Sequence, residues 1–268
     1  SWRSRDSVLT NLDLDELNTT FEGETPEGIL EWAVETFWPD IAMSSSFQTQ
    51  SLPLLHMVSR IAPRLPIIFL DTGFHFPETL AFRDRVTREL GLNLRIVRPS
   101  LSPAELARRY GEGLYRRDPD LCCYVNKVEP MQRALEGLRA WISGIRRDQS
   151  PTRASIRIVE RTAQGIIRVH PMATWTQQDI AQYIHDHSLP EHPLLAQGYL
   201  SIGCAPCTRP IYGGEPARAG RWDGQAKLEC GLHTLLRESV EAQAPTEGGV
   251  GIKGEGGPWG QRPTHGSS

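Results

Sequence analysis

Long apolar runs, a strong charge of either sign and a glycine-rich phosphate loop are all missing from this 268-residue sequence. No apolar stretch approaches the roughly 20 residues that a membrane span needs, and the first residues lack the apolar core of a signal peptide. The net charge of -3 argues against a nucleic-acid surface, which is usually strongly basic. These absences predict a globular cytoplasmic protein that binds neither membrane nor nucleic acid.

Cysteine is also scarce, yet two of the five cysteines, Cys122 and Cys123, are adjacent. Adjacent cysteines form a strained disulfide with each other, and in the cytosol clustered cysteines more often bind metal or do redox chemistry. Cys204 and Cys207 make a second close pair, a C-x-x-C motif. Two unrelated thiol pairs, a structural zinc site and an iron–sulfur cluster are the alternatives. The adjacent pair favours the cluster, because each cysteine can bind a different iron.

The fifth cysteine, Cys230, lies in a polar, glycine-rich region where a core cysteine is not expected. Lys227 and His233 stand close to it in the sequence and could help form its thiolate, which is the nucleophilic species. The chain from Cys207 to Cys230 is long enough for this thiol to enter a site and leave it again. We therefore expect a mobile reactive thiol rather than an inert one.

Strand-like and helix-like segments alternate from about residue 25. Apolar strands are expected at 40–43, 66–70, 92–97 and 140–145, with amphipathic helices between them. This pattern predicts an α/β fold, a parallel sheet with helices on both faces. The segment 155–172 predicts a β-hairpin instead.

Four regions are expected along the chain. An N-terminal extension at 1–24 precedes an α/β nucleotide-binding domain at 25–200, and a segment at 201–241 carries the C-x-x-C motif and Cys230. The proline- and glycine-rich composition of 242–268 predicts a disordered tail. The part after the α/β domain is thus expected to be a mobile C-terminal extension.

Weak anion-binding signals lie at the carboxyl ends of the expected strands. Ser44, Ser45 and Ser46 stand between a strand and a helix, where backbone N–H groups and the helix dipole favour an anion. Asp71 and Thr72 follow the next strand, so both loops should open on the edge where α/β sheets bind ligands. Arginine binds phosphate and sulfate well, although an exposed arginine run is more often only solvated. The arginines in the two later stretches that could do so are Arg146, Arg147, Arg153, Arg218 and Arg221.

Six stretches, in this order and spacing, resemble the assimilatory adenylyl-sulfate and phosphoadenylyl-sulfate reductases. They read SSSFQTQSLPLLH, LDTGFHFPETLAFRD, NKVEPM, GIRRDQSPTRA, GYLSIGCAPCTRP and ECGLH. The resemblance runs from about residue 28 to 235 and implies a Rossmann-like fold of the adenine-nucleotide α-hydrolase type. One branch of the family binds a 4Fe-4S cluster through a Cys-Cys pair and a C-x-x-C motif. The resemblance therefore implies that the ligands here are Cys122, Cys123, Cys204 and Cys207.

The activity that the resemblance implies is the thioredoxin-dependent reduction of adenylyl sulfate to sulfite and AMP, in sulfate assimilation and cysteine biosynthesis. The cysteine of the ECGLH motif, Cys230, is then the nucleophile and carries an S-sulfocysteine intermediate. Reduction of phosphoadenylyl sulfate, or of both nucleotides, is the alternative. A metal-binding nucleotide sensor without enzymatic activity would have no need of Cys230. Assembly with further copies of the chain is left open.

The same resemblance implies roles for the remaining residues. Lys127 follows Cys123 by one helical turn and is expected to link the cluster ligands with the substrate charge. The expected substrate contacts are Ser44, Ser45, Ser46, Asp71, Thr72, Lys127, Arg146, Arg147, Arg218, Arg221 and His233. Gln48 departs from the glycine that many members have at this position, and its side chain would obstruct a close approach of the ligand. The chain after Cys230 is too short for the fused thioredoxin-like domain of plant-type relatives, so a separate thioredoxin is expected.

Overall fold

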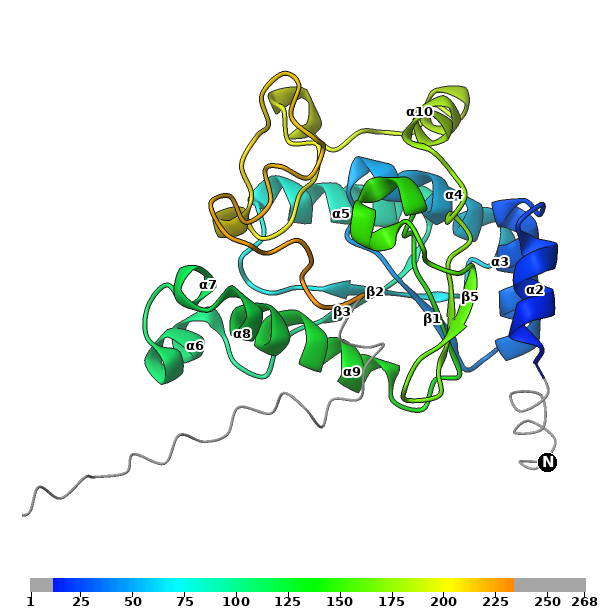
Figure 1. Ribbon diagram of the computed structural model, residues 1–268, viewed down its shortest axis with the longest axis horizontal. Coiled ribbons are helices and arrows are strands. Elements are labelled where there is room, and N and C mark those ends of the chain that lie inside the picture. The colour runs from blue at the N-terminus through cyan, green and yellow to red at the C-terminus, as the bar shows by residue number, and fades with distance from the viewer. Residues whose placement is uncertain (1–11, 234–268) are drawn as a thin grey trace, which may run out of the picture.

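The structure, a computed structural model, describes residues 12–233 and centres on a six-stranded sheet (Figure 1). The strand order is β3–β2–β1–β4–β6–β5. Neighbouring strands are parallel except β5 and β6, which are antiparallel. The predicted α/β fold with a parallel sheet is confirmed, and the hairpin is the antiparallel β5–β6 pair. The strands are β1 (Ile41–Ser44), β2 (Pro66–Leu70), β3 (Asn93–Val97), β4 (Ala140–Ile142), β5 (Val159–Arg161) and β6 (Ile167–Val169).

Helices precede and separate these strands, and several begin at side-chain caps. The Thr25 side chain accepts a hydrogen bond from the N–H of Gly28 at the start of α3, and Thr176 and Asp179 form a capping box on α10. In the described part no helix is both long enough and apolar enough to cross a membrane. The α-helices are α2 (Leu14–Phe21), α3 (Pro26–Phe37), α4 (Leu52–Ile61), α5 (Pro77–Leu90), α6 (Pro103–Tyr110), α7 (Leu114–Arg117), α8 (Pro119–Cys123), α9 (Glu129–Leu135) and α10 (Gln177–Asp186).

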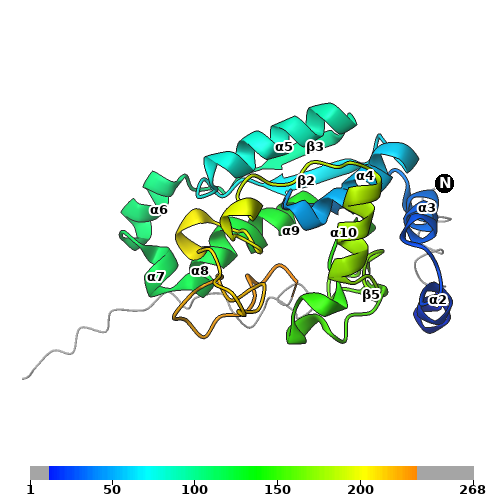
Figure 2. The same cartoon turned by 90° about the horizontal axis from the view of Figure 1, so that it is seen from above.

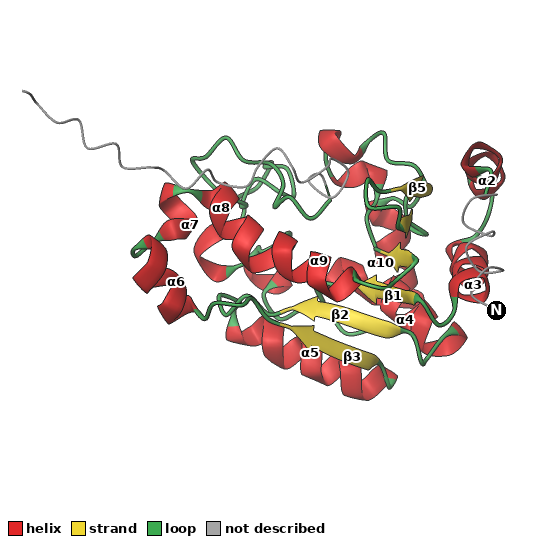
Figure 3. Cartoon of the chain, turned by 90° about the horizontal axis from the view of Figure 1, so that it is seen from below, coloured by secondary structure: helices red, strands yellow, loops and turns green. Residues whose placement is uncertain are grey.

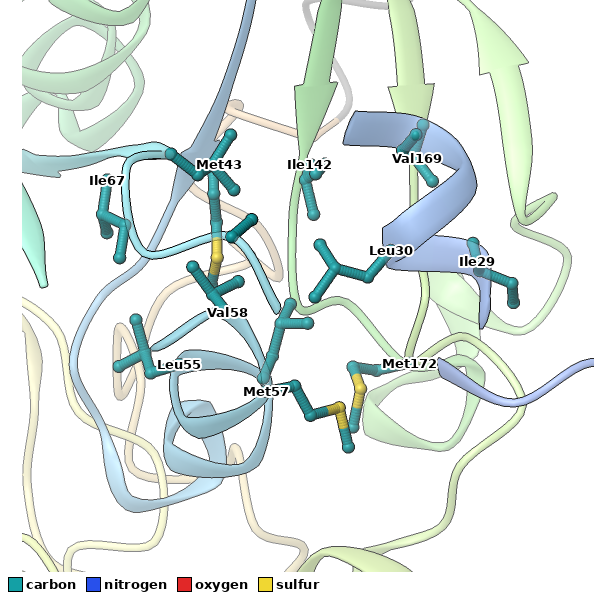
Figure 4. Close-up of a cluster of buried hydrophobic side chains, with 14 of the residues drawn as sticks. Ile29, Leu30, Met43, Leu55, Met57, Val58, Ile67, Ile142, Val169 and Met172 are labelled. Atoms are coloured by element: carbon teal, nitrogen blue, oxygen red, sulfur yellow. The ribbon is translucent and has the colours of Figure 1, made fainter. Parts of the chain in front are cut away.

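Alternate side chains of the central strands enter two cores, one on each face of the sheet. Ile41 and Met43 of β1 join the larger core with α3, α4, α5 and α10, whereas Ala42 joins the smaller core against α9. In β4, Ile142 enters the larger core and Trp141 the smaller one. Figure 3 shows α9 in front of β1 and β2, and Figure 4 shows the larger core with its methionines packed among branched side chains. Burial on both faces explains why these strands are apolar throughout.

The N-terminal region expected to be an extension contains α2, which is joined to the edge of the sheet. The side chain of Asn18 donates to the carbonyl of Val159 at 2.8 Å and accepts from its N–H at 3.0 Å, so one amide satisfies both backbone groups of an edge residue. Residues 1–11 of this region, residues 234–241 and the tail predicted at 242–268 lie outside the described residues.

After α10 the described chain contains short 3-10 turns, η5 (Leu195–Gln197) and η6 (Ala205–Cys207), and otherwise irregular backbone. This segment, drawn yellow to orange, passes beside α8 and α9 (Figure 2). Near its described end, Leu232 packs against the smaller core and His233 stacks on Trp141 of β4, with ring centroids 6.3 Å apart. The fold thereby brings the region of Cys230 to the carboxyl edge of the sheet.

Candidate active site

A pocket opens at the carboxyl edge of β1, β2 and β4, where the order of the strands predicts a ligand site. Ser44, Ser45 and Ser46 line it from the turn between β1 and α4, and Cys230 and His233 line it from the C-terminal segment. The structure therefore brings together residues that are almost 190 positions apart in the sequence. The serine turn and the ECGLH motif thus line the same pocket.

The serine turn owes its shape to a residue in a left-handed conformation. Phe47 has a φ of 52° and a fully buried ring, and its N–H donates to the hydroxyl of Ser45 at 3.1 Å. The hydroxyl of Ser44 accepts a hydrogen bond from the indole of Trp141 at 2.8 Å, which ties β1 to β4. The turn is thus held by its own hydroxyl contacts and by the burial of one aromatic ring.

Gln48 has a different role from the obstruction suggested by the sequence. Its amide nitrogen donates to the carbonyl of Ile202 at 2.6 Å, and its amide oxygen accepts from the N–H of Ile202 at 2.9 Å. This paired contact joins the serine turn to the loop that leads into Cys204. Gln48 still lines the pocket, but its amide is engaged with protein backbone.

Four cationic side chains line the pocket, and Glu229 is the one carboxylate among its lining residues in the described chain. Burial, together with the positive charge of the neighbouring Arg153, lowers the pKa of Arg218 to about 10. Crowded cations of this kind are relieved by a bound anion. The four cations are Lys127, Arg153, Arg218 and Arg221.

Two of the arginines predicted to clamp the substrate do not line this pocket. The guanidinium of Arg147 pairs with the carboxylate of Glu22 at 2.6 Å and donates to the carbonyl of Ile156 at 2.9 Å. Arg146 is buried and pairs with Asp148 at 2.9 Å. Arg153 comes from the same stretch of sequence and lines the pocket, where Arg147 was expected.

Asp71 and Thr72 are also absent from the lining of the pocket. The carboxylate of Asp71 accepts from the N–H of Gly73 at 3.1 Å and lies 3.5 Å from the guanidinium of Arg98. Thr72 is buried, and its hydroxyl lies 3.3 Å from the sulfur of Cys204. Within the loop after β2, Thr72 therefore contacts the C-x-x-C motif, whereas His75 of the same loop lines the pocket.

The surroundings of Cys230 favour its thiolate. Burial alone would raise the pKa of this thiol, but the charge of Lys127, the N–H of Leu232 and the charge of Arg221 outweigh it, and the pKa lies below its ordinary value. Burial opposes the charged form of Lys127 too, yet the nearby sulfurs raise its pKa, so it remains protonated at neutral pH. Lys127 is thus placed to stabilise a negative charge at Cys230.

His233 is fixed in a neutral form by Arg168. The guanidinium donates to Nδ1 of His233 at 2.9 Å, and because arginine has no acceptor, Nδ1 must accept. Burial lowers the pKa of His233 well below its ordinary value, and the positive charges of Arg153 and Arg168 lower it further. The proton of this neutral ring therefore sits on Nε2, which is left as a hydrogen-bond donor at a residue that lines the pocket.

The four remaining cysteines line a second, smaller pocket beside the first. Cys122 and Cys123 come from α8, Cys204 directly precedes the turn η6, and Cys207 ends that turn. The chain continues from α8 through a π-helical turn, η2 (Tyr124–Val128), which carries Lys127. The predicted helical placement of Lys127 after the cysteine pair is present, in π rather than α geometry. Lys127, Arg221 and Trp222 line both pockets and form the wall between them.

The groups of this second pocket that could bind a metal are four thiols, and two of their sulfur atoms have polar contacts. The amide of Asn126 lies 3.5 Å from the sulfur of Cys122, and Thr72 contacts Cys204 as described. Burial, with smaller contributions from neighbouring sulfurs, raises the pKa of Cys122 to about 11 and that of Cys123 to about 12. Among residues 12–233, no group of three or more histidine, cysteine, aspartate or glutamate side chains is arranged to hold a metal ion.

Comparison with known proteins identifies the family. Residues 40–210 match the model of the phosphoadenosine phosphosulfate reductase domain. The chain belongs to this family. It is 45% identical over 213 residues to the adenosine 5'-phosphosulfate reductase of Streptomyces coelicolor, covering 79% of this chain and 89% of that protein. It is 46% identical over 224 residues to the phosphoadenosine 5'-phosphosulfate reductase of Gloeobacter violaceus, covering 82% and 93%.

Solved structures agree with this assignment. The phosphoadenylyl-sulfate reductase of Candida auris, solved as a phosphate complex, superposes with a TM-score of 0.66 at 33% identity, covering 73% of this chain and 96% of that one. The FMN adenylyltransferase of Candida glabrata superposes with a TM-score of 0.52 at 17% identity, covering 77% and 69%, and shares the fold. The family's fold and its reduction of an activated sulfate are therefore properties of this chain.

Several side chains of the site escaped the sequence analysis. Glu229 and Trp222 were not singled out, and Arg153 was named as an anion candidate without a place at the substrate. Glu229 stands directly before Cys230, so its position was visible in the motif, but its partners were not. The guanidinium of Arg221 lies 4.5 Å from the ring centroid of Trp222, a contact that no spacing in the sequence reveals.

Proposed function

We propose that this protein is a thioredoxin-dependent adenylyl-sulfate reductase that works through an S-sulfocysteine on Cys230. The observation that carries the proposal is that a cysteine with a lowered pKa lines the same pocket as four cationic side chains and the serine turn. A pocket with this charge suits a phosphosulfate anion. A nucleotide sensor would need the anion site but not the activated thiol.

In the first step the thiolate of Cys230 attacks the sulfur of the sulfate group. A bond forms between the two sulfurs, the sulfur–oxygen bond to the phosphate breaks, and AMP leaves with that electron pair. Arg218 and Arg221 would hold the phosphosulfate oxygens, and the Nε2 proton of His233 would donate to one of them. The phosphate of AMP is a stable anion, so no general acid is needed for its departure.

In the second step a thioredoxin thiolate attacks the Cys230 sulfur. The sulfur–sulfur bond to the sulfonate breaks, sulfite leaves with the electron pair, and a mixed disulfide remains. The second thioredoxin thiol then releases Cys230 and completes a thioredoxin disulfide. Two electrons thus pass from the dithiol to sulfur, and AMP and sulfite are the products.

We also propose that Cys122, Cys123, Cys204 and Cys207 bind a 4Fe-4S cluster. All four line one small pocket, and hydroxyl and amide groups reach two of the sulfurs, as is common around cluster ligands. A bound cluster would tie α8 to the loop of η6 and present its charge to Lys127 and Arg221. Two unrelated pairs of free thiols would not explain why all four cysteines line the same pocket.

Adenylyl sulfate is proposed as substrate because the chain carries all four cysteines that the cluster-bearing branch uses. Phosphoadenylyl sulfate is the alternative, since the two relatives described above carry different substrate names at nearly equal identity. The 3′-phosphate of phosphoadenylyl sulfate requires one more cationic contact than adenylyl sulfate does. The four cationic side chains that line the pocket are enough to provide it, so the charge of the pocket is compatible with either nucleotide.

The test is a single-turnover experiment with each nucleotide in turn. Mixing the enzyme with adenylyl sulfate alone should release one AMP per chain and add one sulfonate to the peptide that contains Cys230, as seen by mass spectrometry. Reduced thioredoxin should then release sulfite and restore the free thiol. Release of AMP and sulfite together without a thiol donor, or a sulfonate on another cysteine, would exclude the two-step mechanism.

A further inference from the structure

Glu229, the residue directly before Cys230, is fixed by five hydrogen bonds within the described chain. Its Oε1 accepts from Nε of Arg153 at 2.9 Å, from Thr152 at 3.0 Å and from Ser150 at 3.3 Å. Its Oε2 accepts from a terminal nitrogen of Arg153 at 2.8 Å and from Arg218 at 3.4 Å. The Glu229 side chain is 7% exposed, so these bonds replace its solvation almost completely.

The carboxylate of Glu229 opposes the formation of a thiolate at the neighbouring Cys230. Its negative charge raises the pKa of Cys230, against the lowering by Lys127 and Arg221. It also pairs with two of the cations that would otherwise face an anionic substrate. A residue that opposes the thiolate and engages the anion site must contribute something else if it is to be useful there.

The ion pair of Glu229 with Arg153 attaches the segment that carries Cys230 to the rest of the protein. The chain before it, from 212 to 228, has several exposed residues and glycines at positive φ, for example Gly214 at 88° and Gly224 at 75°. Cys230 lies between two side-chain anchors, the pair of Glu229 with Arg153 and the bond of Arg168 to His233. Arg153 belongs to the turn η4 (Pro151–Arg153), and its other terminal nitrogen donates to Gln149 at 2.6 Å. Glu229 is thus joined to a part of the protein that is itself held in place.

We propose that Glu229 is a positioning residue that holds Cys230 inside the substrate pocket through Arg153, and that release of this ion pair lets Cys230 leave the pocket to meet a second thiol. The inference rests on the proposed function, in which Cys230 reacts first with a bound nucleotide and then with a thiolate of another protein. The two partners approach the same sulfur, so the cysteine must be held for one and accessible to the other.

The test measures how fast iodoacetamide modifies Cys230 in the full chain without substrate, followed on the tryptic peptide that begins at Leu228. Rates are taken from about pH 6 to about pH 10, because the rate at any one pH reports both the thiolate fraction and access to the sulfur. At the high-pH plateau the thiol is fully ionised, and only access remains. Glu229→Gln keeps the size of the side chain and removes its charge.

We expect Glu229→Gln to raise the plateau rate about tenfold or more, as the loss of hydrogen bonds between charged groups allows. Glu229→Asp, which keeps the charge on a shorter side chain, should give an intermediate rate. Glu215→Gln is the matched control: Glu215 pairs with Arg209 at 2.9 Å in the same segment and does not line the pocket. An unchanged plateau in Glu229→Gln, or an equal rise in Glu215→Gln, would overturn the proposal.

The two half-reactions provide a readout that a merely structural role would not give. In Glu229→Gln the release of AMP from bound nucleotide should slow, while thioredoxin should discharge preformed sulfocysteine at least as fast as in the wild type. Equal slowing of both steps would show that Glu229 only supports the fold and would refute the proposal. If the wild type forms no sulfocysteine, the proposed function fails, and the alkylation plateau still decides whether Glu229 holds Cys230.

Discussion

Arg168 donates a hydrogen bond to Nδ1 of His233 at 2.9 Å and lies 4.1 Å from the ring centroid of Trp141. The arginine is 1% exposed, so the tautomer of His233 is set from inside the protein. The pocket thereby receives an N–H donor that carries no charge and does not titrate near neutral pH, because burial holds the pKa of His233 far below that range.

The first prediction distinguishes the roles of the two ring nitrogens of His233, Nδ1 and Nε2. Asparagine keeps an acceptor near Nδ1 but loses the donor at Nε2, whereas glutamine can place its amide N–H near Nε2. His233→Asn should lower kcat/KM about tenfold to about a hundredfold, the effect of one hydrogen bond of about 1.5–3 kcal/mol to a charged group. His233→Gln should retain more activity. Steady-state kinetics with adenylyl sulfate checks both, and equal activity of wild type and His233→Asn would contradict the assignment.

The arginines provide the second prediction. Arg218→Ala and Arg221→Ala should each lower kcat/KM by about tenfold to a hundredfold, since each removes a charge-assisted contact of about 1.5–3 kcal/mol from the pocket. Arg147→Ala is the natural comparison, because its guanidinium pairs with Glu22 outside the pocket and should leave kcat/KM nearly unchanged. A loss in Arg147→Ala as large as in Arg218→Ala would restore the role that the sequence analysis gave it.

The contrast between Arg147 and Arg153 shows what the sequence could predict. The alternation of apolar strands and helices was enough for the α/β fold and for the edge at which the serine turn opens. The sequence showed two close cysteine pairs, Cys122–Cys123 and Cys204–Cys207, but only the family resemblance implied that the two pairs act as one set. Which arginine of the stretch 144–154 faces the pocket depends on the two 3-10 turns η3 (Arg147–Gln149) and η4, whose geometry leaves no periodic pattern.

The contact made by Gln48 is a second feature that the sequence could not predict. A single residue in place of glycine suggested a steric obstacle, because the sequence does not show which distant backbone is near. In the structure that backbone is Ile202, 154 positions away, and the amide of Gln48 satisfies both of its polar groups. Contacts across such separations are set by the whole fold and not by local preference.

The third prediction concerns this contact. Gln48→Ala leaves the N–H and carbonyl of Ile202 without their partner, which should lower the free energy of unfolding by about 1–3 kcal/mol. Gln48→Glu is informative beside it, because a carboxylate can still accept from the N–H but cannot donate to the carbonyl. Urea unfolding of the two variants and the wild type measures the difference. Stability in Gln48→Ala equal to that of the wild type would show that the paired contact contributes nothing.

The fourth prediction concerns the four cysteines that line the second pocket. Protein purified without oxygen should be brown and contain about four irons and four sulfides per chain, as a cube on four thiolates requires. Serine at Cys122, Cys123, Cys204 or Cys207 should remove the colour and the iron, whereas Cys230→Ser should keep both. Stoichiometric zinc without visible absorption, measured by elemental analysis, would refute the cluster and favour the structural zinc site.

The last prediction concerns pH. Burial would raise the pKa of Cys230, and Lys127 is the largest of the contributions that lower it instead. Removing this positive charge destabilises the thiolate, so the pKa should rise and the rate of a thiolate reaction should reach its midpoint at a higher pH. Lys127→Met removes the charge at similar length, and Lys127→Arg keeps it. The pH dependence of iodoacetamide modification at Cys230 should shift upward in the methionine variant and stay near the wild-type curve in the arginine variant, with similar plateau rates in all three. Coincident midpoints would mean that Lys127 does not activate the nucleophile, and that its contribution lies with the substrate or the cysteine pocket alone.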